Sequence, residues 1–174
     1  MVARVDYREL KRFMKDGFIA LGVPEDAVET CATVLIESDL RGIESHGIGR
    51  FKMYVDRMRQ GIQHAVTKET LINKTANTAV IDGGDGMGQV IAVHAMNMAI
   101  DMARNANIGM VAVRNSTHFG ITGYYPSMAV EQGMVGLAFS NARSSVAPTF
   151  GVEPVIGTNP ISFGAPSDEE YPFL

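Results

Sequence analysis

Apolar positions in the first third of the chain recur every three or four residues, which predicts helices. One helix is expected between an Asp6 cap and Gly22, and a second between Pro24 in its first turn and Arg41-Gly42 at its end. A third is expected between a Ser45 cap and Gly61. The first of these helices carries its apolar residues at Leu10, Phe13, Met14 and Phe18, and the second buries Val28, Cys31, Ala32, Leu35 and Ile36.

After Gly61 the pattern changes to short apolar or alternating runs separated by glycine-rich turns, which is typical of strands. Two short strands are expected at 68–73 and 78–82, buried strands at 108–116 and 134–141, and a last strand at 161–166. Helices are expected at 89–104 and 124–133, and residues 142–160 as an irregular segment. The alternation predicts an α/β domain over 62–174, preceded by a helical segment over 1–61.

Composition narrows the class of protein. The 174 residues are 46 % hydrophobic and 20 % charged, with a net charge of −4 and no basic run, which argues against nucleic acid as the main partner. No apolar run is long enough to cross a membrane. The charged N-terminus lacks a signal core, and the single cysteine, Cys31, cannot form an internal disulfide, so we predict a cytoplasmic protein.

The stretch VIDGGDGMGQV places a strand, a glycine-rich turn and a helix in the order of a dinucleotide fingerprint. The glycine spacing fails, because the third glycine should fall at Gln89 or at Ile91. The alternative is a turn at a helix N-terminus whose backbone N–H groups contact a substrate or cofactor.

The stretch ESHGIGRFKMY spaces His46, Arg50 and Tyr54 four residues apart, so a helix would place them on one face. Arginine presents a planar fork to a carboxylate, and histidine transfers protons near neutral pH. The set could hold a 2-oxo or 2-hydroxy acid, with Gly47 and Gly49 leaving space for a ligand or another backbone. The alternative is a solvated surface helix.

His118, in the stretch NSTHFGITG, follows a strand, where α/β proteins usually place their sites. It could contact a ligand or be a structural histidine bonded to a backbone carbonyl. The polar loops FSNARSS and GTNP could bind phosphate or ribose. No cysteine pair or His-x-x-x-His spacing indicates zinc, so no metal is expected.

Three motifs in register, SDLRGIESHGIGR, THFG and GTNPISFGAP, resemble the type-2 malate/L-lactate dehydrogenase family, which includes ureidoglycolate and sulfolactate dehydrogenases. The resemblance implies a mixed α/β fold that is not a Rossmann fold, an NAD or NADP cofactor and a homodimer. Family members are longer, so it also implies that this chain is the N-terminal half, with 62–174 as the first part of the cofactor-binding domain. The chain then stops before an acidic D-x-A-T segment that contributes an aspartate.

By position, the resemblance implies that His46 is the proton donor, with His118 as a second acid/base candidate, and that Arg50 clamps the substrate carboxylate. Which histidine is the chief acid stays open. Tyr54 and Thr158 match substrate contacts. The positions that match cofactor contacts are Ser45, His118, Gly120, Ser140, Asn141, Ala142 and Asn159.

The function implied is hydride transfer between a nicotinamide and a small 2-hydroxy or 2-oxo acid, with malate/oxaloacetate favoured. Ureidoglycolate, sulfolactate, a sugar acid or a cyclic imino acid are alternative substrates within the family. A non-catalytic assembly module is the alternative outside it.

Overall fold

The computed structural model describes residues 4–174, so the first three residues of the predicted helical segment lie outside it. The chain divides into two compact units, one ending at Ile121 and the other running from Thr122 to Leu174. Helices and strands are mixed, and the predicted α/β class is confirmed. None of the helices within residues 4–174 combines the length and the apolar character needed to cross a bilayer.

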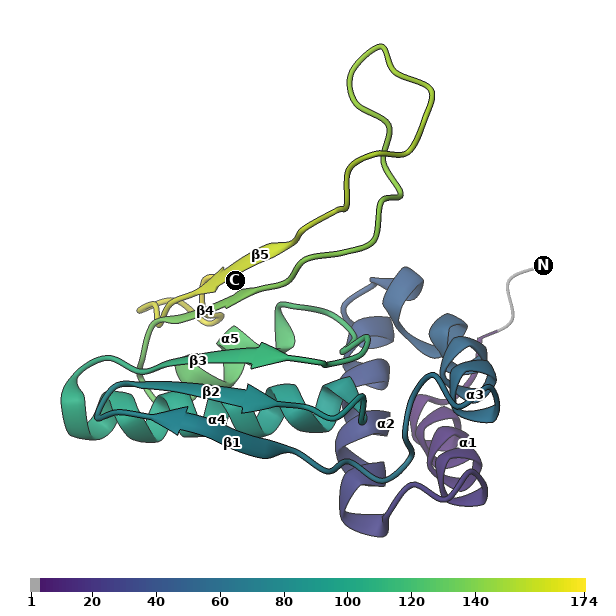
Figure 1. The fold of residues 1–174 in the computed structure, drawn as a ribbon, viewed down its shortest axis with the longest axis horizontal. Coiled ribbons are helices and arrows are strands. Elements are labelled where there is room, and N and C mark those ends of the chain that lie inside the picture. Colours follow the sequence, from purple (N-terminus) through teal and green to yellow (C-terminus); the bar gives the residue numbers. More distant parts are fainter. Residues whose placement is uncertain (1–3) are drawn as a thin grey trace. The chain divides into compact units, whose positions relative to one another are not determined.

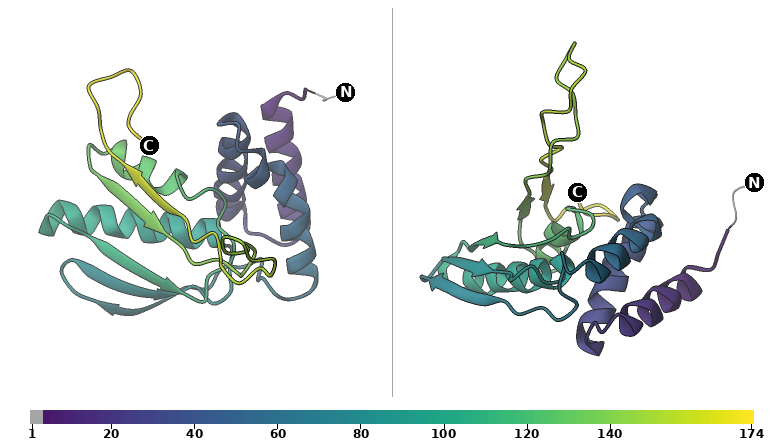
Figure 2. Two further views of the ribbon diagram at one scale, coloured as in Figure 1. Left: turned by 90° about the horizontal axis from the view of Figure 1, so that it is seen from above. Right: turned by 45° about the vertical axis from the view of Figure 1, so that its right-hand side comes forward.

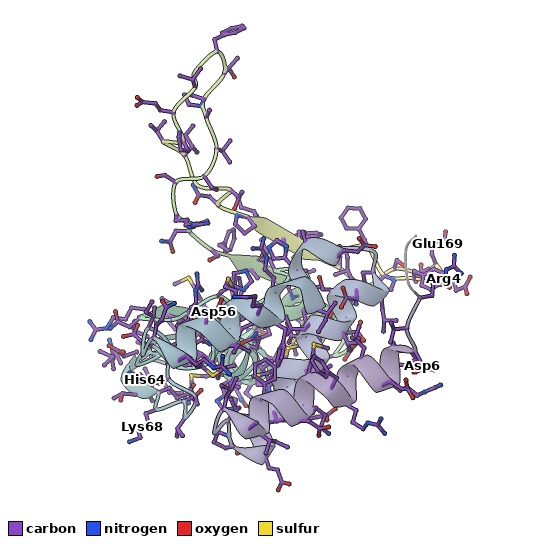
Figure 3. The ribbon with its side chains drawn as sticks, turned by 90° about the vertical axis from the view of Figure 1, so that its right-hand side faces the viewer. Arg4, Asp6, Asp56, His64, Lys68 and Glu169 are labelled. Atoms are coloured by element: carbon purple, nitrogen blue, oxygen red, sulfur yellow. The ribbon has the colours of Figure 1, made fainter. Side chains whose placement is uncertain are left out.

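The first two helices begin and end close to the predicted positions. In α1 (Tyr7–Ala20), the Asp6 carboxylate accepts a backbone N–H of the first turn at 2.7 Å, and Figure 3 places Asp6 at that end of the helix. Helix α2 (Glu25–Leu40) starts one residue later than expected, because Pro24 occupies the N-cap position and not the first turn. Gly22, between them, has a positive φ of 84°, which glycine adopts without strain.

The helices share one apolar core. The five residues predicted to face inward from α2 are all buried, and Met14 and Phe18 of α1 pack against them. The Phe18 ring makes edge contacts with Phe51 at 4.9 Å and with Tyr54 at 6.2 Å between centroids. These aromatic contacts pack Phe51 and Tyr54, which follow Arg50, against α1.

The third helix is shorter than predicted. Two 3-10 turns, Glu44–His46 and Ile48–Arg50, precede α3 (Phe51–Arg59), and Gly47 between them has non-helical dihedrals of −89° and −139°. Ser45 lies inside the first turn and caps no helix. The expectation that His46, Arg50 and Tyr54 share one continuous helical stripe is therefore wrong.

A three-stranded mixed sheet completes the first unit. Strand β2 (Thr78–Asp82) pairs antiparallel with β1 (Thr70–Lys74) and parallel with β3 (Met110–Arg114), and α4 (Gly88–Ala106) connects β2 to β3. Figures 1 and 2 show the sheet and α4 as two layers. The strand predicted as buried at 108–116 is mostly exposed, because β3 lies at the edge of the sheet and pairs with β2 alone.

The second unit contains α5 (Tyr124–Val130) and an antiparallel pair, β4 (Gly136–Phe139) and β5 (Ile161–Gly164). Strand β4 is also more exposed than predicted, since it pairs with β5 alone in a two-stranded sheet. The segment between β4 and β5 is irregular, as expected, apart from one bridge between Val146 and Ile156.

Candidate active site

Two segments of the first unit bring the predicted histidines together. His46 ends the first 3-10 turn, and His118 lies in the loop after β3. Their rings are stacked, with centroids 5.5 Å apart and planes inclined by 22°. The chain thus joins two motifs that lie about seventy residues apart in sequence into one pair of imidazoles.

Tyr54 and Gly120 determine which ring nitrogen of His118 carries the proton. The Gly120 backbone N–H donates to Nδ1 at 3.3 Å, so Nδ1 is an acceptor and carries no hydrogen. The Tyr54 hydroxyl, 2.6 Å from the same nitrogen, must then donate as well. The proton of the neutral imidazole therefore sits on Nε2, where it can be donated to a ligand oxygen.

Burial and nearby positive charge lower the pKa of both imidazoles. Loss of solvent is the main cause that lowers the pKa of His118 to about 4, and His46, Arg57 and Arg50 lower it further. The pKa of His46 is also lowered, by burial and then by Arg50. Burial raises the pKa of Tyr54, which keeps its phenol protonated as a donor.

Arg50 is held by one edge of its guanidinium. Its Nε donates to the Ser45 carbonyl at 2.6 Å, while Ser45 Oγ lies 2.9 Å from Nδ1 of His46. Residues 4–174 give the two terminal amino groups of Arg50 no hydrogen-bond partner. This leaves the forked side of the guanidinium open for a carboxylate.

The loop that carries His118 is bound to the start of α4. Thr117 Oγ1 donates to the Gly86 carbonyl at 2.7 Å and accepts the Gly88 N–H at 3.1 Å. A Cβ at Gly88 would overlap the backbone carbonyls of Thr117 and His118. Glycine is therefore required here for close approach of the two backbones.

The glycine-rich turn does not present free amides to a ligand, contrary to that interpretation of the sequence. Each backbone N–H from Gly83 to Gly88 is already bonded within the chain. The acceptors, in chain order of the donors, are the oxygens of Arg114, Asp82, Asn115, Gly83, Thr67 and Thr117. The turn is a structural joint between β2, α4 and the His118 loop.

The remaining predicted cofactor and substrate positions belong to the second unit. Ser140, Asn141 and Ala142 follow β4, and Thr158 and Asn159 precede β5. The Asn159 side-chain carbonyl accepts the Ala142 N–H at 2.9 Å, so the two predicted loops meet each other. Ser140 Oγ bonds the Asn141 carbonyl at 3.0 Å.

Sequence reasoning assigned no role to Asp39 or Thr117, although both lie inside quoted motifs. Asp39 accepts the Ile48 N–H at 2.8 Å, between His46 and Arg50. One feature of the sequence could have indicated this contact. Asp39 lies near the end of a predicted helix, and the turn that follows contains Gly47, which has no side chain to cap the next N–H.

Comparisons with known proteins agree on one family. Residues 5–174 match the family model described as malate/L-lactate dehydrogenase. The chain is 46 % identical over 171 residues to a malate dehydrogenase of Pyrococcus abyssi, covering 98 % of this chain and 47 % of that protein. It is 42 % identical over 168 residues to an L-sulfolactate dehydrogenase of Methanothermobacter thermautotrophicus, covering 97 % and 49 %.

A solved structure, malate dehydrogenase from Entamoeba histolytica, matches with a TM-score of 0.94 at 44 % identity, covering 99 % of this chain and 48 % of that chain. The chain thus spans about half the length of the relatives it matches. The match over nearly all of its residues agrees with the resemblance that the three motifs carry. This chain belongs to the malate/L-lactate dehydrogenase family.

Proposed function

We propose that this chain forms part of an NAD(P)-dependent 2-hydroxy acid dehydrogenase. The observation that carries the proposal is the stacked pair of His46 and His118, 5.5 Å apart, beside the open guanidinium fork of Arg50. Hydroxy acid oxidation needs a group that exchanges a proton with the substrate oxygen and a cation that binds the adjacent carboxylate. The three side chains supply both requirements.

In this proposal Arg50 binds the carboxylate of the substrate through its two terminal amino groups. Its Nε is already bonded to the Ser45 carbonyl, so the fork has a fixed direction. Tyr54 orients His118, and the Nε2–H of His118 donates to the substrate oxygen as a neutral hydrogen-bond donor. A histidine whose pKa lies near 4 is a poor proton carrier at neutral pH but a stable donor.

His46 is then the residue that exchanges the proton. It is half-buried, and its pKa is lowered by burial and by Arg50. In the part of the chain that the structure describes, Nδ1 of His46, unlike Nδ1 of His118, does not accept hydrogen bonds from two donors. As a 2-oxo acid is reduced, the protonated His46 delivers the proton to the developing alkoxide. As a hydroxy acid is oxidised, neutral His46 accepts it.

The nicotinamide supplies or accepts the hydride. The fit of the described residues to this cofactor is partial. The amides of the glycine-rich turn are occupied, which does not suit a pyrophosphate there. The polar groups of half-buried Ser140 and of exposed Asn141 and Thr158 suit ribose hydroxyls or a carboxamide. We therefore assign the substrate side to His46, Arg50 and His118, and part of the cofactor side to residues within 62–174.

Malate and oxaloacetate are the proposed substrate pair. Arg57 acts on His118 in addition to Arg50, so two cations influence the pair of imidazoles. Such a field suits a substrate with a second negative group. Sulfolactate shares this feature, and two of the relatives are named for malate and for sulfolactate. A homodimer remains a prediction from the family resemblance, and a cytoplasmic location remains a prediction from the N-terminal sequence and the single cysteine.

The test is a substrate panel followed by loss of NADH or NADPH absorbance, using the product of the complete gene. Oxaloacetate, pyruvate, 2-oxoglutarate, 3-sulfopyruvate, diketogulonate and a cyclic imine are each offered with both cofactors. Faster turnover of oxaloacetate or 3-sulfopyruvate than of pyruvate supports the dianion assignment. No turnover and no cofactor binding would contradict the dehydrogenase proposal and favour an assembly module.

A further inference from the structure

Asp39, at the last turn of α2, reaches across to the segment that carries His46 and Arg50. Its Oδ2 accepts the backbone N–H of Ile48 at 2.8 Å. Ile48 begins the second 3-10 turn, and an N–H at the start of a helical turn has no acceptor within that turn. The residue before it, Gly47, has no side chain that could act as a cap. Asp39 supplies the missing acceptor from a different helix.

Gly47 and Asp39 fit each other closely. Gly47 is buried, and a Cβ built on it would overlap the carboxyl group of Asp39. The space beside Gly47, expected from the sequence to admit a ligand or another backbone, is therefore filled by this carboxylate. Gly49 is less restricted, because its nearest neighbour would be the Glu44 carbonyl at an ordinary 3.5 Å.

The contact lies between the two side chains that the proposed reaction uses. His46 immediately precedes Gly47, and Arg50 follows Ile48 by two residues. The other end of the segment is held by the same helix, since Ser38 Oγ donates to the Ile43 carbonyl at 2.7 Å. Two consecutive residues of α2 thus hold both ends of the 43–48 turn.

The carboxylate is partly removed from solvent. Burial raises the pKa of Asp39, the Ile48 N–H opposes that shift, and Glu44 adds to it. Asp39 is partly buried and directs its hydrogen bond to a single amide, that of Ile48, so it is suited to hold that amide in place.

We propose that Asp39 is a positioning residue that sets the distance and direction between His46 and Arg50 by holding the Ile48 amide. The inference rests on the proposed dehydrogenase function for its kinetic consequence. Displacement of a positioned group by about 1 Å can lower a rate by on the order of 100-fold. Loss of the Asp39 contact should therefore affect turnover and substrate binding without direct contact between Asp39 and the substrate.

The experiment compares Asp39→Ala with Asp39→Asn in the product of the complete gene, using oxaloacetate with the preferred cofactor. Asparagine keeps an oxygen that can accept the Ile48 N–H, whereas alanine does not. We expect Asp39→Ala to lower kcat/KM by about 10- to 100-fold, with KM raised, and Asp39→Asn to stay within about threefold of wild type. Glu44→Gln is the matched control, because it removes a neighbouring charge without touching Ile48, and its kcat/KM should be unchanged.

A second variant tests the fit to Gly47. Gly47→Ala should lower kcat/KM by about tenfold or more in the wild-type background, because the added Cβ displaces the carboxylate. In the Asp39→Ala background the same change should cost less than about threefold. Additive losses would overturn the proposal, as would an Asp39→Ala protein with lowered thermal stability but wild-type kcat and KM.

Amide hydrogen exchange separates this inference from the proposed function. Faster exchange of the Ile48 amide in Asp39→Ala, but not in Glu44→Gln, supports the contact even if the panel reveals no dehydrogenase activity. Unchanged exchange in Asp39→Ala would overturn the positioning role, whatever the enzyme turns over.

Discussion

The hydroxyl of Tyr54 lies 2.6 Å from Nδ1 of His118, although the two residues are 64 positions apart in the chain. Tyr54 is completely buried between α1 and the His118 loop. Its ring packs in the core against Phe18, while its hydroxyl bonds His118 in the candidate site. Together with the Gly120 N–H, it leaves Nε2 of His118 as the protonated nitrogen. This contact links the stability of the helical core to the chemistry of the histidine pair.

Tyr54→Phe should lower kcat/KM for oxaloacetate by about tenfold, because one hydrogen bond that orients His118 is lost. The apolar ring remains, so the melting temperature should change little. Nitrogen NMR of the imidazoles should report more of the Nδ1-protonated tautomer of His118 than in wild type. A variant with the wild-type tautomer and wild-type kinetics would contradict the orienting role.

The lowered pKa of His118 predicts a dependence of stability on pH. Because the ring protonates near pH 4 in the folded chain and near 6.5 when unfolded, the unfolded chain binds more protons between these values. The free energy of unfolding should therefore fall as the pH is lowered from about 6.5 to about 4, by on the order of 2 kcal/mol after allowance for partial exposure.

Urea unfolding at pH 7.0 and 4.5 measures this difference. His118→Asn should remove most of it, whereas His64→Asn, at an exposed histidine, should keep the wild-type difference. Equal pH dependence in wild type and His118→Asn would contradict the assignment.

His46→Gln should lower kcat by about 10²–10⁴-fold in both directions of the reaction, since general acid–base catalysis contributes about that much. The lowered pKa of His46 also predicts how the rate depends on pH. Malate oxidation needs neutral His46, so its rate should fall only at acidic pH, below the usual range for histidine. His94→Gln, at an exposed histidine paired with Glu69, is the control. A His46→Gln protein within twofold of wild type would exclude the proton-exchange role.

Arg50→Lys separates charge from geometry. Lysine keeps the positive charge but lacks the fork, so we expect KM for oxaloacetate to rise by about tenfold or more, with kcat changed by less than about threefold. Arg59→Lys, at an exposed residue at the end of α3, should leave both constants unchanged. Wild-type KM in Arg50→Lys would mean that a point charge is sufficient at this position.

The sequence predicted those features that depend on local pattern. The cap of α1 follows from Asp6, whereas the buried face of α2, strand β2 and helix α4 follow from the pattern of apolar residues, and all are present. The exposure of β3 and β4 could not be predicted from their apolar residues. Such residues show only that a strand is able to be buried, whereas the pairing of strands in the sheet decides which faces are covered. The break in the helix at Gly47 was not predicted for a related reason. The four-residue spacing of His46 and Arg50 is typical of a helix, but here the Asp39 carboxylate holds a turn instead.

Within the site, the motifs and the family resemblance named His46, Arg50, Tyr54 and His118 as candidates. The structure adds how they meet, through hydrogen bonds that join segments far apart in the chain. Thr117 was not selected, since a threonine in a loop carries no chemical signal until its partners are known, and Asp39 was not selected because its partner, the Ile48 N–H, lies nine residues further along the chain.

Thr117 provides a test of how firmly the His118 loop must be held. Thr117→Val preserves shape but leaves the Gly88 N–H and the Gly86 carbonyl without their partner. The free energy of unfolding should fall by about 1–2 kcal/mol, because Thr117 is half-buried and water can replace part of the lost bonding. Thr117→Ser keeps the hydroxyl and should lose less than half as much.

The kinetic readout distinguishes a positioning role of Thr117 from a purely structural one. If the two bonds hold His118 in register with His46, kcat/KM should fall in Thr117→Val at a temperature where the protein is fully folded, and Thr117→Ser should restore most of it. Ser116→Ala, at the exposed neighbouring residue, is the control and should match wild type in both stability and rate. Lower stability with unchanged kcat/KM in Thr117→Val would mean that the β2–α4 turn supports the fold alone, and that Tyr54 and Gly120 are sufficient to orient His118.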